Sequence, residues 1–234
     1  MERLVLFDID CTLIDGHGAG QRAVLRALRE VYGVEGELGG YSFHGRTDPV
    51  IVRELVALWG NGRPGHSDER RIETRLEACL ARYVELLRGE IEDGRVEILP
   101  GVGELVPALA EDERVVLGLL TGNVEEGARL KLAPTGLMPH FKVAAYGSDA
   151  PTRPGLPDVA VRRAEALTGR RFTGKEIVII GDTPADIGCG EHLGVRTIAV
   201  ATGRYSVEEL RTHAPDHVFG DLGDWRAAQA AIFA

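Results

Sequence analysis

Four aspartates stand in two short polar segments, each directly after an apolar run. Asp8 and Asp10 follow the first apolar run of the chain, and Asp182 and Asp186 follow a later one. Aspartate is also common as a cap or turn former, so neither pair alone indicates catalysis. If the pairs converge, two carboxylates about 4 Å apart repel by roughly 4 kcal/mol at an effective dielectric constant of 20, and the cluster needs a cation. Oxygen ligands without His or Cys favour Mg²⁺.

A third polar segment, Thr121-Gly122-Asn123, follows another apolar run. Its hydroxyl group and backbone N–H groups suit the oxygen atoms of a phosphate. A polar turn with Gly at a positive φ explains the segment equally well when it is taken alone. The three segments together are more informative, because ligands of an open α/β sheet bind beyond the carboxyl ends of its strands.

The elements that must position these residues are continuous apolar strands that alternate with helices, a pattern that predicts a parallel sheet covered on both faces. The expected strands are 3–9, 114–120, 141–145, 176–180, 195–200 and 217–219, and the helices among the later strands are 102–110, 124–132, 157–167, 185–193 and 207–212. Three further helical patterns, 21–32, 48–59 and 68–87, follow one another after the first strand without any strand among them.

The simplest architecture is an α/β fold in which a helical cap is inserted into a three-layer, Rossmann-like parallel sheet. Residues 1–15 and 96–234 would form the core domain, and residues 16–95 the cap domain. The stretches 16–20 and 93–101 would be the linkers between the two. The first linker contains three glycines but lacks the G-x-G-x-x-G spacing of a dinucleotide site, so a hinge is the better interpretation.

Composition limits the partners that the chain can have. The formal net charge of -9 disfavours nucleic acid, because such a partner requires clustered Lys and Arg. Cys11, Cys79 and Cys189 have no C-x-x-C spacing and indicate neither a disulfide framework nor a zinc site. The first apolar run is too short and too acidic for a secretory signal, and no run reaches the roughly 18 residues of a membrane span. We expect a cytoplasmic monomer or homodimer that acts on a small molecule, without a nucleic-acid or membrane partner.

In this order, the three polar segments resemble the motifs of the haloacid dehalogenase superfamily. FDIDCTL is similar to the first motif, LLTGN to the second and IIGDTPADI to the fourth, and the segments LPGV and GLMPHF extend the likeness over essentially the whole chain. The insertion between the first two motifs resembles the family's helical cap of the first type. The family's phosphatases carry Asp two residues after the nucleophile, as Asp10 does here, whereas its dehalogenases and phosphonatases do not. The resemblance therefore implies a phosphatase similar to phosphoglycolate phosphatase.

The chain departs from the family pattern at two positions. Cys11 stands where the family usually has Gly, which changes the turn but removes no reacting group. The third motif is normally a Lys followed by Pro, and the segment 148–157 contains no Lys. Arg153, directly before Pro154, is the candidate for this cationic role, since a guanidinium can hold both a phosphate and a carboxylate. The alternative is a solvated loop arginine.

The resemblance also implies roles for the acids. Asp8 would attack phosphorus and form an aspartyl phosphate, and Asp10 would serve first as the acid and then as the base. Mg²⁺ would be held by Asp8, the backbone carbonyl of Asp10 and Asp182, with Asp186 as a ligand through water or as an orienting partner.

The remaining phosphoryl oxygens would be gathered by Thr121, the amides of Gly122 and Asn123, and Arg153. In the expected cap, the polar loop 43–48 precedes a helix, and Asp48 or Thr47 would be its N-cap residue. Arg46 and Thr47 are the substrate-binding candidates of this loop. Arg46 could pair with a substrate carboxylate, which would suit phosphoglycolate, and it could equally be a surface arginine in a helix-entry loop.

Two other functions remain open from the sequence. A sugar-phosphate mutase with the same core would return the phosphoryl group to a substrate rather than to water. A catalytically inert module could use the acidic cluster only to hold Mg²⁺ or an acyl phosphate, although such a receiver-like module needs no inserted cap.

Overall fold

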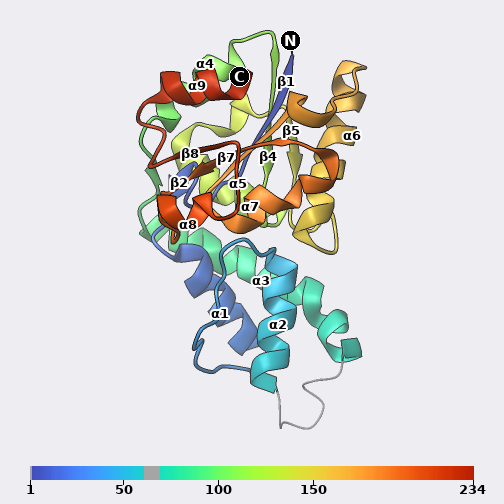
Figure 1. Cartoon of the computed structure of the whole chain (residues 1–234). Coiled ribbons are helices and arrows are strands. Elements are labelled where there is room, and N and C mark those ends of the chain that lie inside the picture. Colours follow the sequence, from blue (N-terminus) through green and yellow to red (C-terminus); the bar gives the residue numbers. More distant parts are fainter. Residues whose placement is uncertain (1, 61–68) are drawn as a thin grey trace.

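A six-stranded parallel sheet forms the centre of the protein (Figure 1), as seen in a computed structural model that describes residues 2–60 and 69–234. Its strands are β1 (Arg3–Phe7), β4 (Val115–Leu120), β5 (Val143–Ala145), β6 (Ile177–Gly181), β7 (Arg196–Val200) and β8 (His217–Phe219), in the order β5-β4-β1-β6-β7-β8. Phe7 at the end of β1 pairs with Leu119 of β4 and with Ile180 of β6. The carboxyl ends of these three strands therefore lie side by side.

Helices cover both faces of the sheet, because side chains of the central strands are apolar on both sides. Val5 and Phe7 lie in one cluster with α4 (Val102–Ala110), α5 (Glu125–Leu132) and α9 (Trp225–Phe233). Leu4 and Leu6 lie in another with α6 (Leu156–Thr168) and α7 (Pro184–Cys189). The expected three-layer α/β fold is confirmed.

Three helices pack on one another beside the sheet, below it in Figure 1, and are called the helical unit here. They are α1 (Ala19–Tyr32), α2 (Asp48–Gly60) and α3 (Glu69–Asp93), and their buried apolar side chains form a separate cluster. A small antiparallel sheet of β2 (Ile14–Asp15) and β3 (Glu97–Ile98) pairs the chain entering the unit with the chain leaving it. The expected domain boundaries remain a prediction.

Several element ends differ from the expected ones for local reasons. The helix expected to end at residue 87 continues to Asp93, where Ile91 still packs on the apolar cluster of the helical unit. The starting residue expected for this helix, Asp68, lies outside the described residues. Helix α7 stops at Cys189, where Gly190 has non-helical backbone angles, and a 3₁₀ turn follows. Helix α9 was not expected at all.

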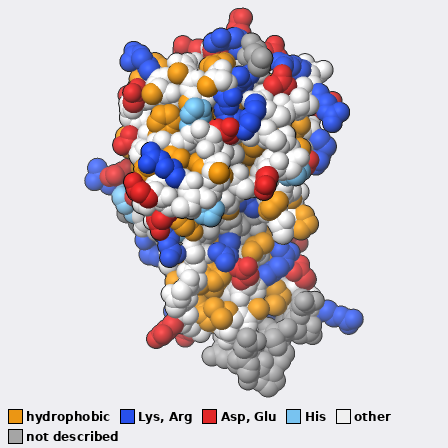
Figure 2. Space-filling view, viewed as in Figure 1, with side chains coloured by type: hydrophobic (Ala, Val, Ile, Leu, Met, Phe, Trp, Pro, Cys, Tyr) orange, Lys and Arg blue, Asp and Glu red, His pale blue; other side chains and the backbone are white. Residues whose placement is uncertain are grey.

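The remaining helical segments are short. They are α8 (Val207–Arg211) and 3₁₀ turns at Ala133–Thr135, Met138–His140, Arg153–Gly155, Gly174–Glu176 and Glu191–Leu193. Basic and acidic side chains are interspersed over the face drawn in Figure 2, without one continuous basic area there. Within the described ranges, no helix combines the length and the apolar character needed to cross a lipid bilayer.

Candidate active site

The acidic residues of the site come together because they continue neighbouring strands. Asp8 follows the last residue of β1, and Asp182 follows the last residue of β6. Asp186 lies one turn into α7, whose N-cap residue Thr183 binds it in a capping box. Carboxylate oxygens of Asp8, Asp182 and Asp186 lie within 4.8 Å of one another, and all three residues are buried. The two sequence segments thus form one cluster.

Arg153 is the cation that contacts this cluster. Its Nη2 lies 3.1 Å from Oδ1 of Asp8 and donates a hydrogen bond to Asp186. Asp186 also accepts hydrogen bonds from the backbone N–H of Thr183 (3.0 Å) and from its hydroxyl group (2.6 Å). Asp182 is less well satisfied, because its Oδ2 is buried and has no hydrogen-bond partner in the structure. One guanidinium therefore faces three carboxylates.

Burial raises the pKa of Asp8 and of Asp182 above the ordinary value, and the neighbouring carboxylates raise both further. The positive charge of Arg153 acts in the opposite direction but does not cancel the effect. The cluster thus offers three buried carboxylates, whose negative charge is only partly compensated and one of whose oxygen atoms has no hydrogen bond. Such a set of donors fits a hard divalent cation.

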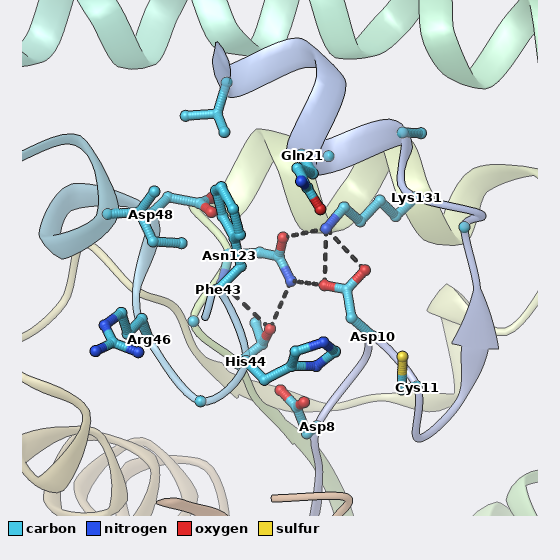
Figure 3. A pocket seen from close by; sticks show the side chains of 18 of the residues that line it. Asp8, Asp10, Cys11, Gln21, Phe43, His44, Arg46, Asp48, Asn123 and Lys131 are labelled. Atoms are coloured by element: carbon cyan, nitrogen blue, oxygen red, sulfur yellow. Dashed lines mark hydrogen bonds and ion pairs between the residues drawn. The ribbon is translucent and has the colours of Figure 1, made fainter. Parts of the chain in front are cut away.

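Asp10 points away from this cluster and toward Lys131 (Figure 3). Nζ of Lys131 donates to Oδ1 and Oδ2 of Asp10 (2.8 and 2.7 Å) and to Oδ1 of Asn123 (2.6 Å). Nδ2 of Asn123 also donates to Oδ2 of Asp10 (2.7 Å). The Lys131 side chain is 7% exposed and that of Asp10 43%, so Asp10 faces open space while Lys131 supports it from the interior.

The charges of this pair are fixed by their contact. Burial alone would raise the pKa of Asp10, but Lys131 and the hydrogen bond from Asn123 lower it below the ordinary value. Burial would likewise lower the pKa of Lys131, but Asp10 and Asp48 raise it. Both groups are therefore charged at neutral pH.

Lys131 is the main site residue that sequence reasoning missed. No motif contains it, yet one signal was available, because it belongs to the buried face of α5 together with Ala128 and Leu132. A lysine is rarely fully buried without a partner, so a lysine at an apolar helical position indicates a buried ion pair.

The turn between β4 and α5 is tightly packed. Oγ1 of Thr121 accepts hydrogen bonds from the backbone N–H and from Nδ2 of Asn123 (3.2 and 2.8 Å). A Cβ atom at Gly122 would lie 2.0 Å from the carbonyl oxygen of Arg46, so glycine is required there by the close approach of another loop.

That approaching loop, residues 43–48, belongs to the helical unit. The backbone N–H of Asp48 donates to the carbonyl of Gly122 (2.8 Å), and Oδ2 of Asp48 accepts from the backbone N–H of Val124 (2.8 Å). Burial raises the pKa of Asp48 to about 6. Asp48 was expected only as a possible cap of its own helix, whereas its carboxylate lies at the start of α5.

The substrate-binding roles expected of Arg46 and Thr47 remain predictions, and the structure places Arg46 at the cavity between the helical unit and the strand ends. Nε of Arg46 lies 2.8 Å from Glu54, its Nη1 donates to the carbonyl of Ser42, and its guanidinium lies over the ring of Tyr41. In Figure 3 its side chain points away from Asp8. Thr47 is buried, and its hydroxyl group has no hydrogen-bond partner in the structure.

A cavity of about 280 Å³ lies between the helical unit and the strand ends. Its lining includes residues of both parts, among them Asp8, Asp10, Phe43, Lys131 and Asp182. This volume suits a small metabolite rather than a polymer, and its walls carry both carboxylates and cations.

Comparison with known proteins identifies the family. The family model described as haloacid dehalogenase-like hydrolase matches residues 5–200, which is most of the chain. The chain belongs to this family. The matched range includes the segments that carry Asp8, Thr121 and Asp182.

Three similar proteins differ in name. A protein from Caldanaerobacter subterraneus carries the name "Putative pyrophosphatase PpaX". It is 27% identical to this chain over 218 residues, which are 93% of this chain and 90% of that protein. A phosphoglycolate phosphatase from Pseudomonas fluorescens is 25% identical over 95% of this chain and 78% of its own length. The crystal structure of a β-phosphoglucomutase from Clostridium difficile has a TM-score of 0.73 at 18% identity, covering 100% of this chain and 98% of that one.

The charge imbalance of the cluster predicts that Asp182→Asn stabilises the metal-free protein. The folded state holds the Asp182 proton more tightly than the unfolded chain does, so ionisation of this group destabilises the fold increasingly as pH rises above the ordinary value of 3.8. We expect the midpoint of thermal unfolding, measured in EDTA at pH 8, to rise by roughly 2–4 °C, as for a gain of about 1 kcal/mol.

The rise in the unfolding midpoint should become smaller toward pH 4. The control is Asp158→Asn, which changes a half-exposed residue outside the cluster. An unfolding midpoint of Asp182→Asn at or below that of the unchanged protein at pH 8 would show that Asp182 is adequately compensated without a cation.

Proposed function

We propose that this chain is a Mg²⁺-dependent phosphatase that hydrolyses a small phosphate monoester through an aspartyl phosphate on Asp8. The observation that carries the proposal is that Asp8, in contact with Arg153, and Asp10, which faces open space, line the same cavity. A carboxylate able to attack phosphorus and one able to transfer protons thus border one space of metabolite size.

Asp8, Asp182 and Asp186 would hold the magnesium ion, together with the backbone carbonyl of Asp10. The unpaired Oδ2 of Asp182 and the excess of carboxylates over guanidinium groups support this fit. When bound, the ion supplies positive charge that offsets the charge of the phosphoryl oxygens.

In the first step, a carboxylate oxygen of Asp8 bonds to phosphorus and the bond from phosphorus to the leaving oxygen breaks. Arg153, the hydroxyl group of Thr121, and the amides of Gly122 and Asn123 bind the phosphoryl oxygens. Water then attacks the aspartyl phosphate, inorganic phosphate departs and the Asp8 carboxylate is regenerated.

Asp10 transfers the protons, first to the leaving oxygen and later from the attacking water. Lys131 and Asn123 act through Asp10 as positioning residues, because their hydrogen bonds fix the direction of its carboxylate. The negative charge of a bound phosphate raises the pKa of a neighbouring carboxyl group. This charge opposes the effect of Lys131 and allows Asp10 to carry the proton.

The charges beside the cavity favour a leaving group that is itself anionic. Lys131 places a buried ammonium group beside Asp10 at the cavity wall, and a carboxylate or phosphate on the leaving group is attracted to it. Glycolate and phosphate, the leaving groups of phosphoglycolate and pyrophosphate, both have this property. Arg46 contributes to such recognition only if it releases Glu54.

A substrate screen tests the proposal. Purified protein is assayed for release of inorganic phosphate from phosphoglycolate, pyrophosphate and a neutral-alcohol ester such as glycerol phosphate, with Mg²⁺ and with EDTA. We expect Mg²⁺-dependent turnover with preference for the two anionic leaving groups. Isomer formation from a hexose phosphate without phosphate release would identify a mutase instead, and absence of turnover on every ester would identify an inert module.

Asp8→Asn should abolish hydrolysis, because an amide cannot form the acyl phosphate. We expect kcat to fall by at least about 10³-fold, with the circular dichroism spectrum unchanged. Asp158→Asn is the matched control and should keep full activity. Retention of activity by Asp8→Asn would overturn the assignment of the nucleophile.

Lys131→Met should slow the reaction in a way that depends on the leaving group. Without the ammonium group, Asp10 is no longer held in one direction, and we expect kcat to fall by about 10²-fold for an alkyl phosphate that needs a proton from Asp10. A nitrophenyl phosphate, whose leaving group needs little protonation, should lose much less.

Lys142→Met, which alters an exposed lysine, is the control. Equal losses of kcat on both esters would exclude a role of Lys131 through Asp10, and thermal unfolding separates that result from a general loss of stability.

A further inference from the structure

A second group of potential metal ligands lies beside the acidic cluster. Sγ of Cys11, a ring nitrogen of His44 and a carboxylate oxygen of Asp182 lie within 4.8 Å of one another. Cys11 follows β1, His44 belongs to the loop of the helical unit, and Asp182 follows β6. Figure 3 shows Cys11 and His44 on the same side of the cavity as Asp8.

These three donors differ chemically from those of the acidic cluster. Thiolate, imidazole and carboxylate are the ligands that Zn²⁺ takes in proteins, commonly as three side chains with a fourth position left open. Mg²⁺, in contrast, selects oxygen ligands. The two adjacent groups of ligands therefore discriminate between a hard cation and a thiophilic one.

Two further observations point to a ligand at this place. Asp182 is 1% exposed, and its Oδ2 has no hydrogen-bond partner in the structure. His44 is exposed and Cys11 partly so, which gives an ion a path from solvent to the buried carboxylate.

We propose that Cys11, His44 and Asp182 form a binding site for a thiophilic divalent cation, with Zn²⁺ as the expected occupant. The site shares Asp182 with the acidic cluster, so an ion bound here removes a ligand from Mg²⁺. It also joins the loop of the helical unit to the two strand ends, so it holds the cavity closed. Zn²⁺ is therefore an inhibitor of the enzyme, a consequence that rests on the proposed phosphatase function, whereas the binding itself does not.

Binding needs only local adjustments. In tetrahedral zinc sites the ligand atoms lie roughly 3.5 Å apart, and the exposed ring of His44 is free to make this approach. On coordination the Cys11 thiol becomes a thiolate, and its proton passes to solvent. No oxidant, reductant or other reactant is required.

Direct titration with Co²⁺ tests the site without any assay of activity. Metal-free protein is titrated with Co²⁺, and we expect a thiolate-to-cobalt charge-transfer band in the near ultraviolet that Zn²⁺ then abolishes by displacement. Cys11→Ser should eliminate the band, and His44→Ala should weaken the affinity for Co²⁺ and Zn²⁺ at least tenfold. Cys79→Ser and His213→Ala are the matched controls and should keep both the band and the affinity.

A spectrum without a charge-transfer band, or one unchanged in Cys11→Ser, would overturn the proposed site whatever the enzymatic activity. Cys11→Gly removes the thiol at a left-handed backbone position (φ 58°) that glycine accepts, and it is the second variant if Cys11→Ser does not fold.

The inhibitory effect has its own test. Zn²⁺ added to the Mg²⁺-supported reaction should inhibit the unchanged protein, and Cys11→Ser should require at least tenfold more Zn²⁺ while keeping its activity in Mg²⁺ alone. Equal inhibition of both proteins would overturn the inhibitory role. A Cys11-dependent cobalt band in a protein without phosphatase activity would instead uphold the site and contradict the proposed function.

Discussion

Repulsion among buried carboxylates at the ends of β1 and β6 is the constraint on which the arrangement of this protein depends. Parallel pairing makes these strands neighbours, so Asp8 and Asp182 cannot separate without loss of the sheet. Burial raises the pKa of both, and Arg153 compensates only part of the charge. The pairing of the strands keeps these carboxylates close despite their repulsion. A bound cation would reduce this repulsion, so the site favours cation binding.

On the other side of the cavity, the negative charge of Asp10 is compensated by a direct ion pair with Lys131. Asp10, Lys131 and Asn123 are joined by hydrogen bonds, and the carboxylate of Asp10 and the ammonium group of Lys131 have opposite charges. At one wall of the cavity the carboxylates outnumber the single guanidinium of Arg153, and at the other the charges of Asp10 and Lys131 balance. In the proposed function, a divalent cation at the first wall offsets the carboxylates there and attracts the phosphoryl group of the substrate to this wall.

Much of the fold and part of the site could be predicted from the sequence, because the polar residues of the acidic cluster directly follow the apolar runs that form the strands. The apolar runs that end before Asp8, Thr121 and Asp182 indicate the strands and their carboxyl ends. Because neighbouring parallel strands end at the same edge of a sheet, these three residues are expected to lie together. Lys131, Asp48 and the pair of Cys11 with His44 escaped prediction because they contact residues that lie far away in the sequence. The contacts of Asp48 and His44 also require the helical unit to lie against the strand ends. Helix α9 was missed although its buried residues Ala228, Ala231 and Ile232 have the spacing of one helical face.

The contact of Asp48 with the turn at Gly122 has a consequence for the timing of the reaction cycle. Asp48 gives its N–H to the carbonyl of Gly122 and takes the N–H of Val124, so it is hydrogen-bonded on both sides of Asn123. Any swing of the helices that admits substrate must break these two bonds. Under the proposed function, Asp48 supports the phosphate-binding turn only while the helical unit lies against it, so one motion would both complete this turn and exclude bulk water from the cavity.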